Sequence, residues 1–180
     1  MMEQEPDVCF VGELNDPEVA RLAVQAGFAR RVVFARMSAN NSINAIQSLI
    51  DMGVPPFLVS GSIIASVNQR LVRRLCPACR VAYVPSPALL AELGIRFAPG
   101  TQLYKAVGCA QCENKGYQGN IVLFELYIPN EELSEMFISR APVKEILKRA
   151  AEISLVPLKY DGAQKAAAGY VAIEDVLNAI

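Results

Sequence analysis

The 180-residue sequence contains no histidine, which excludes imidazole acid–base catalysis and histidine ligation of metals. It also lacks an uninterrupted apolar run of the roughly 18 residues needed to span a bilayer. The nearest approach, residues 54–67, is ended by Gln69 and Arg70. The first five residues include two glutamates and no basic residue, whereas a signal peptide begins with a basic region. We therefore expect a cytoplasmic protein, in a compartment where thiols stay reduced.

Neither sign of charge dominates the composition. Seventeen basic and 18 acidic residues give a net charge of -1. Proteins that bind nucleic acid broadly through its phosphates are usually basic, so the composition argues against that class, although local basic patches remain compatible with it. The length suffices for one ordinary domain or two small ones, and for a real hydrophobic core.

The first part of the chain alternates between two hydrophobic patterns. Short apolar runs predict strands, and capping residues followed by apolar residues at helical spacing predict helices. Strands are expected at 8–12 and 31–37, and helices at 16–28, 41–53 and 57–75. This order predicts an α/β layer built on a parallel sheet.

The rest of the chain has a different character. From Cys76 to Leu126 it is punctuated by prolines, glycines and cysteines, with a short helix at 86–94 and strand-like runs at 103–107 and 121–128. From Asn130 it is helical, with breaks at Pro142, Pro157 and Gly169. We expect three consecutive domains, at 1–72, 73–128 and 129–180. The apolar residues of the last one should form the core of a small helical subdomain: Leu133, Met136, Phe137, Ile146, Leu147, Leu155 and Leu158.

Four of the five cysteines form two Cys-x-x-Cys pairs, Cys76 with Cys79 and Cys109 with Cys112. Two intervening residues let a tight turn direct both sulfurs at one ion, and a second such turn completes a tetrahedron. Unrelated buried thiols or two disulfides are the alternatives, and a reducing compartment disfavours the disulfides. We therefore predict one structural Zn²⁺ site with no open position for catalysis. Cys9, in the first predicted strand, is expected to be a small buried residue.

The first predicted strand ends at a glutamate, Glu13. In open α/β sheets ligands gather at the carboxyl edge, and a glutamate there can orient the attacking water in phosphoryl transfer. An exposed acid at the end of a strand is also common without any such role. The pattern alone leaves both readings open.

A series of motifs extends in one order along nearly the whole chain. It starts with Glu5-Pro6-Asp7-Val8 and Val11-Gly12-Glu13-Leu14-Asn15-Asp16. The others are Asp51-Met52-Gly53-Val54-Pro55-Pro56-Phe57-Leu58, Gln69-Arg70-Leu71-Val72-Arg73-Arg74-Leu75-Cys76-Pro77-Ala78-Cys79, Lys115-Gly116-Tyr117-Gln118-Gly119, Glu125-Leu126, Asp161-Gly162, Lys165, Ala168-Gly169 and Glu174-Asp175-Val176-Leu177. Together these collinear motifs resemble the ATPases of type II secretion and type IV pilus assembly, and the first two resemble the Walker B segment of that family.

The resemblance implies the C-terminal portion of a hexameric cytoplasmic motor that hydrolyses ATP. The fold would be α/β: a partial RecA-like core of P-loop NTPases, a four-cysteine zinc module and a helical C-terminal region. Glu13 would be the catalytic glutamate and Asp7 a nearby Walker B acid. Arg70 and Arg73, on the helix that leads into the zinc module, would contact nucleotide or a neighbouring subunit, or else form a solvated helix face. The partners would be the inner-membrane platform of the secretion or pilus system and its cytoplasmic components, with peripheral attachment to that membrane.

Several departures from the family pattern bear on activity. The phosphate-binding loop, Gly-x-x-x-x-Gly-Lys-[Ser/Thr], does not occur in these 180 residues. Arg31, Ser38 and Phe124 stand where the family carries histidines, and Asn15 replaces an arginine. ATP and Mg²⁺ would therefore bind only if an upstream loop is present, and this chain alone should not turn over ATP. A sheet without its preceding strands should also expose an edge and an apolar face.

Two other functions fit parts of the sequence. The chain can be a free-standing, non-catalytic zinc-containing module that docks on a secretion or pilus complex. It can also be a nucleic-acid-binding zinc ribbon, because Arg70, Arg73, Arg74 and Arg80 lie near the first cysteine pair. No aromatic residues for base stacking are interleaved with these arginines, and the net charge is slightly negative, so we expect no nucleic-acid partner.

Overall fold

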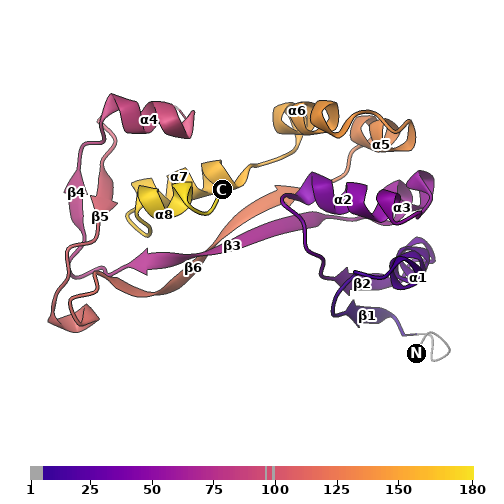
Figure 1. Ribbon diagram of the computed structural model, residues 1–180, viewed down its shortest axis with the longest axis horizontal. Coiled ribbons are helices and arrows are strands. Elements are labelled where there is room, and N and C mark those ends of the chain that lie inside the picture. Colours follow the sequence, from indigo (N-terminus) through magenta and orange to yellow (C-terminus); the bar gives the residue numbers. More distant parts are fainter. Residues whose placement is uncertain (1–5, 96, 99) are drawn as a thin grey trace. The chain divides into compact units, whose positions relative to one another are not determined.

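The computed structural model describes residues 6–95, 97–98 and 100–180 (Figure 1). The chain forms two compact units, each assembled from two segments. The first consists of residues 1–68 and 126–155, and the second of residues 69–125 and 156–180. The helical C-terminal stretch is thus shared between them. The division into three consecutive domains at 1–72, 73–128 and 129–180 stays a prediction.

The first unit begins with the predicted alternation of strands and helices. Strands β1 (Val8–Val11) and β2 (Val32–Ala35) are parallel, with Val8 opposite Val32, and α1 (Pro17–Phe28) connects them. Helices α2 (Ser42–Asp51) and α3 (Pro56–Ser62) follow. The capping residues act as expected, because the side chain of Asp16 accepts from the N–H groups of Glu18 and Val19, and that of Asn41 from Asn44.

Helices α5 (Glu131–Ile138) and α6 (Val143–Ile153) complete this unit. Their apolar residues do not form a core of their own, contrary to the sequence-based expectation. Leu133, Phe137 and Ile146 pack in one cluster with α1, α2 and α3, whereas Leu158 belongs to the core of the second unit. Helical periodicity identifies a buried face, but it does not say which other helices cover that face.

The parallel sheet exposes one of its faces, as expected for a sheet of only two strands. Val11 and Val33 pack against the core on one side. On the other side Phe10 is 72% exposed and Phe34 59% exposed. Within the described residues no further strand pairs with β1 or β2. Because parallel sheets are normally covered on both faces, this surface is unusual for the isolated chain.

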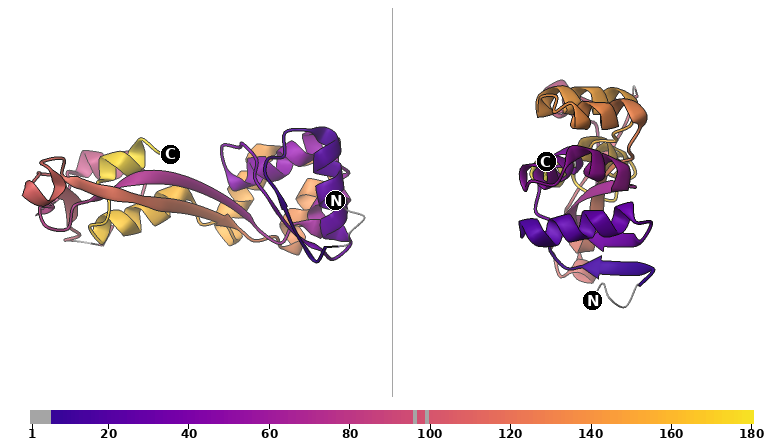
Figure 2. Two further views of the ribbon diagram at one scale, coloured as in Figure 1. Left: turned by 90° about the horizontal axis from the view of Figure 1, so that it is seen from below. Right: turned by 90° about the vertical axis from the view of Figure 1, so that its right-hand side faces the viewer.

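The second unit holds the cysteines and two pairs of strands. Strand β3 (Ser66–Leu75) pairs with β6 (Tyr117–Tyr127), and these long strands lie next to each other in Figure 2. Strand β4 (Val81–Tyr83) is antiparallel to β5 (Leu103–Lys105), with α4 (Pro87–Leu93) between them in the chain. Helices α7 (Leu158–Ala167) and α8 (Ile173–Leu177) close the unit.

The long helix predicted from Phe57 to Leu75 is wrong. Helix α3 ends at Ser62, and residues 66–75 form β3. Within this strand burial alternates, since Asn68 and Val72 are buried whereas Val67, Gln69 and Leu71 are exposed. A period of two is the signature of a strand, but only Val67, Leu71, Val72 and Leu75 are apolar here, and their spacing in the sequence does not show it. No helix among the described residues is both long and apolar enough to cross a membrane.

Helix α7 packs closely on α8 at Gly162. A Cβ atom at position 162 would overlap Val176 Cγ1 and lie 3.2 Å from Cγ2. We expect Gly162→Ala to destabilise the second unit by up to about 2 kcal/mol, because overpacking costs about 1–3 kcal/mol and the gain in helix propensity returns about 1. Urea unfolding measures this change.

The matched control is Gly12→Ala, where an added Cβ meets nothing within 4 Å. It should leave stability within about 0.5 kcal/mol of the parent. In the double variant Gly162→Ala/Val176→Ala the clashing neighbour is truncated. Its loss of stability should therefore be smaller than the sum of the losses of the two single variants. Additive losses would contradict a steric origin.

Candidate functional site

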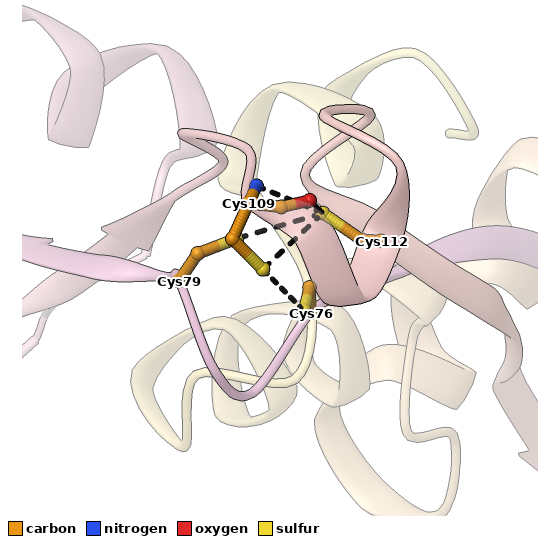
Figure 3. Close-up of side chains that lie close together, drawn as sticks. All are labelled: Cys76, Cys79, Cys109 and Cys112. Atoms are coloured by element: carbon orange, nitrogen blue, oxygen red, sulfur yellow. Dashed lines mark hydrogen bonds between the residues drawn. The ribbon is translucent and has the colours of Figure 1, made fainter.

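The first cysteine pair lies in the turn that follows β3. Cys76 comes directly after Leu75, the last residue of the strand. The backbone N–H groups of Cys79 and Arg80 both donate to the carbonyl of Cys76, at 3.3 and 3.1 Å. This turn directs the two sulfurs to the same side, toward the second pair (Figure 3).

The second pair brackets a short 3₁₀ turn, η2 (Ala110–Cys112). Gly108 precedes it with φ of +111°, and a Cβ there would lie 2.7 Å from the carbonyl oxygen of Asn114. Only glycine fits this position, because any side chain would be strained and would strike the backbone. The N–H of Cys76 donates to the carbonyl of Gly116 at 3.0 Å and joins the two turns.

The four sulfur atoms converge with the spacing of a tetrahedral metal site. All four lie within 4.8 Å of one another. The Sγ–Sγ distances are 4.0 Å for Cys76–Cys109, 3.8 Å for Cys79–Cys112 and 3.7 Å for Cys109–Cys112. Zinc–sulfur bonds of about 2.3 Å in a tetrahedron place the sulfurs about 3.8 Å apart, so the four residues fit a zinc ion. The predicted clustering is confirmed. Cys9, half-buried in β1, is not part of this cluster.

The sulfurs differ in how readily they lose a proton. Burial raises the pKa of Cys79 to about 11, although a hydrogen bond from the Gly108 backbone opposes the shift. Burial acts in the same direction on Cys112, but the N–H groups of Cys109 and Gly116 donate to its sulfur at 3.3 and 3.1 Å and help lower its pKa to about 6. Zinc binds thiolates, so metal binding by this cluster releases protons and its affinity rises with pH.

Glu13 lies just beyond the carboxyl end of β1. Next to it, Arg36 follows the carboxyl end of the neighbouring strand β2, and its Nη2 atom pairs with Glu13 Oε2 at 3.3 Å. Both side chains are well exposed. The backbone fixes this pairing, because the N–H of Arg36 donates to the carbonyl of Val11 and that of Leu14 to the carbonyl of Arg36. Sequence reasoning missed Arg36, although its position after the second strand was a usable signal.

Asp7 does not join Glu13. It precedes β1 and Glu13 follows it, so the length of the strand separates the two acids. A residue in an extended strand advances the chain by about 3.3 Å, which excludes a common site for these side chains.

Arg70 and Arg73 lie on a strand rather than on the helix expected for them. They are three residues apart on this strand, and both line one surface pocket together with Asp175. Arg73 donates to Asp175 Oδ1 at 2.6 Å and to the hydroxyl of Tyr117 at 3.3 Å, and its guanidinium stacks 3.9 Å from the centre of the Tyr117 ring. The hydrogen bond with Asp175 raises the pKa of Arg73 further above its ordinary value.

The other arginines near the first cysteine pair also contact tyrosines. Arg74 lies over the ring of Tyr170 at 5.9 Å and Arg80 over that of Tyr104 at 5.1 Å. These aromatic partners come from distant parts of the chain, which explains why the sequence showed no interleaving. The stacked and bonded arginines are held by the protein itself, and this weakens a role in binding nucleic acid.

The fold has the α/β architecture of a solved class of bacterial ATPases. The structure of the Legionella pneumophila ATPase DotB matches it with a TM-score of 0.63 at 12% identity, over 97% of this chain and 38% of that one. The Yersinia pseudotuberculosis ATPase DotB matches with a TM-score of 0.65 at 14% identity, over 98% and 37% of the two chains. At such identities the likeness establishes the fold alone.

The family follows from the sequence comparison. The model of the family described as "Type II/IV secretion system protein" matches residues 1–178, and the chain belongs to this family. The type II secretion system protein E of Pseudomonas aeruginosa is 37% identical over 178 residues, which is 99% of this chain and 35% of that protein. The type IV pilus assembly ATPase PilB of Thermus thermophilus is 36% identical over 98% of this chain and 20% of its own length. The resemblance drawn from the motifs is confirmed, and the chain spans about a third or less of these curated relatives.

Proposed function

We propose that this chain is the C-terminal portion of a motor ATPase of type II secretion or type IV pilus assembly. The observation that carries the proposal is the match of the family to residues 1–178, together with the convergence of the four cysteines. In this proposal the first unit contributes the second part of a RecA-like core, and Zn²⁺ stabilises the turns that carry Cys76, Cys79, Cys109 and Cys112. A four-thiolate shell leaves no ligand position open, so the metal is structural.

Glu13 is the residue proposed to act on nucleotide. It lies at the carboxyl edge of a parallel sheet, where ligands of α/β proteins bind, and it orients the attacking water. Arg70 or Arg73 contacts nucleotide or a neighbouring subunit. ATP and Mg²⁺ need a phosphate loop from outside these 180 residues, so the chain alone does not hydrolyse ATP. The assembled protein is a homo-oligomer, proposed to be a hexamer, at the cytoplasmic side of the inner membrane, where it contacts the platform of the secretion or pilus system.

A titration with a fluorescent ATP analogue, combined with a phosphate-release assay, tests the nucleotide part. We expect no micromolar binding and no release above buffer for the 180-residue chain. The matching test is to read the DNA upstream of the codon for Met1 for a continuous frame that encodes a phosphate loop. Micromolar ATP binding by the chain would contradict the proposal, because it would require a phosphate site elsewhere.

The second candidate is a non-catalytic zinc-containing module that docks on a secretion or pilus complex. The ion pair between Arg36 and Glu13 favours it, because the proposed catalytic carboxylate already has a cationic partner. The two functions can be separated by deleting the gene that encodes this protein and complementing the deletion with a copy that carries Glu13→Gln. A motor should lose secretion or piliation with this variant, whereas a docking module should retain it.

A further inference from the structure

The turn that carries the first cysteine pair is attached to the end of helix α7. Arg80 directly follows Cys79 in the chain. Its Nη1 atom donates to the backbone carbonyls of Gly169 and Ala168, the latter at 3.4 Å, while its guanidinium lies over the Tyr104 ring. One side chain thus joins the cysteine turn to the residues that follow α7.

The carbonyl of Ala168 is one of those that a helix end leaves without intrahelical partners, and the carbonyl of Gly169 follows directly after the C-cap. The last four carbonyls of a helix are unpaired and carry the negative end of its dipole, so a guanidinium is a suitable partner. Ala168 is the C-cap of α7, and Gly169 follows with φ of +76°. A Cβ at position 169 would lie 2.7 Å from Arg80 Nη1 and 2.9 Å from the Tyr104 ring. The glycine therefore leaves the space that Arg80 occupies.

A second hydrogen bond attaches the other side of the same turn. The N–H of Leu75, the residue before Cys76, donates to the carbonyl of Tyr170 at 2.8 Å. The cysteine turn is thus fixed on both flanks to residues 168–170, which connect α7 to α8. All of these contacts lie within the second unit.

We propose that the metal site controls the docking of helices α7 and α8, with Arg80 as the positioning residue that couples them. The inference rests on the proposed zinc site. Bound metal fixes the turn from Cys76 to Cys79, and with it the positions of Arg80 and the Leu75 N–H, so that both engage residues 168–170. Removal of the metal frees the turn and loosens α7 and α8. The coupling is reciprocal: loss of the Arg80 contact weakens metal binding by the same factor by which metal removal weakens the docking of α7 and α8.

Hydrogen exchange of the full chain, zinc-loaded and after chelation, tests the coupling. Chelation should accelerate exchange in residues 158–177 by about tenfold or more, the effect expected from losing charge-assisted hydrogen bonds. Residues 17–28 and 42–51 of the first unit should be unchanged. Acceleration confined to residues 76–80 and 106–116 would overturn the proposal.

Two substitutions break the same contact from opposite sides. Arg80→Gln removes the guanidinium, and Gly169→Ala displaces it while all four cysteines stay in place. With zinc bound, both should accelerate exchange in α7, and both should lower the affinity for zinc by about tenfold in competition with a chromophoric chelator. Arg80→Lys should recover part of the affinity, because it keeps the charge but not the planar fork.

Arg21→Gln is the control for charge, since it removes the same charge from an exposed position on α1 in the first unit. It should leave the zinc affinity unchanged. If this control lowers the zinc affinity as much as Arg80→Gln does, the loss comes from the change in net charge, and the proposal is overturned. Metal analysis keeps the two claims distinct: less than half an equivalent of zinc overturns the metal site itself, whereas full zinc without coupled exchange overturns only the role of Arg80.

Discussion

Replacing Cys112 with serine should abolish stoichiometric zinc binding and lower the midpoint of thermal unfolding of the second unit by about 10 °C or more. Cys112 is buried, and its sulfur lies 3.7 Å from Cys109 Sγ and 3.8 Å from Cys79 Sγ. It is also the sulfur that the backbone prepares for a metal, through the N–H groups of Cys109 and Gly116. A hydroxyl is a poor ligand for zinc and leaves three thiolates facing an open position. Metal analysis and calorimetry measure the two effects.

Cys9→Ser provides the matched control. Cys9 is half-buried in β1 and lies outside the four-sulfur cluster, so the same change of atom should leave zinc binding intact. A parent protein purified under reducing conditions with less than half an equivalent of zinc would contradict the site. Equal zinc content in Cys112→Ser and the parent would contradict the assignment of this residue as a ligand.

Local chemistry explains what the sequence could predict. Spacing within each cysteine pair requires only a tight turn, and the capping residues Asp16 and Asn41 act on the helices that directly follow them. The strand ending at Glu13 was likewise recognised from its apolar run. These features depend on residues that are close in sequence, so the amino-acid sequence alone suffices to predict them.

The features that the sequence did not predict depend on distant residues. Arg73 pairs with Asp175, 102 residues away, and contacts Tyr117, 44 residues away. Arg80 reaches the end of α7 across 89 positions. The same reason explains the error at residues 66–75, because it is pairing with β6, some 50 residues later in the chain, that holds this segment as a strand.

The core of the first unit leads to a second large expected effect. Phe137→Ala should destabilise that unit by about 3–5 kcal/mol, as measured by urea unfolding followed through NMR signals of α2. Phe137 is 2% exposed, and its ring meets that of buried Tyr127 edge-to-face, with centroids 6.5 Å apart. The substitution leaves a cavity between α5 and the helices of the N-terminal segment. It also removes the aromatic pair, which is worth about 0.5–1.5 kcal/mol beyond the buried area.

Phe10→Ala applies the same truncation to the exposed face of β1, where the side chain is 72% exposed. It should change the stability by less than about 0.5 kcal/mol, because little apolar area leaves a packed environment. The same variant should reduce self-association in sedimentation experiments, since Phe10 contributes to an uncovered apolar surface. Equal destabilisation by the two variants would mean that the β1–β2 face is covered in solution, and unaltered stability of Phe137→Ala would contradict the packing of α5 against the N-terminal helices. Comparing the two phenylalanines thus distinguishes the core of the first unit, which is packed within this chain, from the face of the β1–β2 sheet, which this chain leaves uncovered.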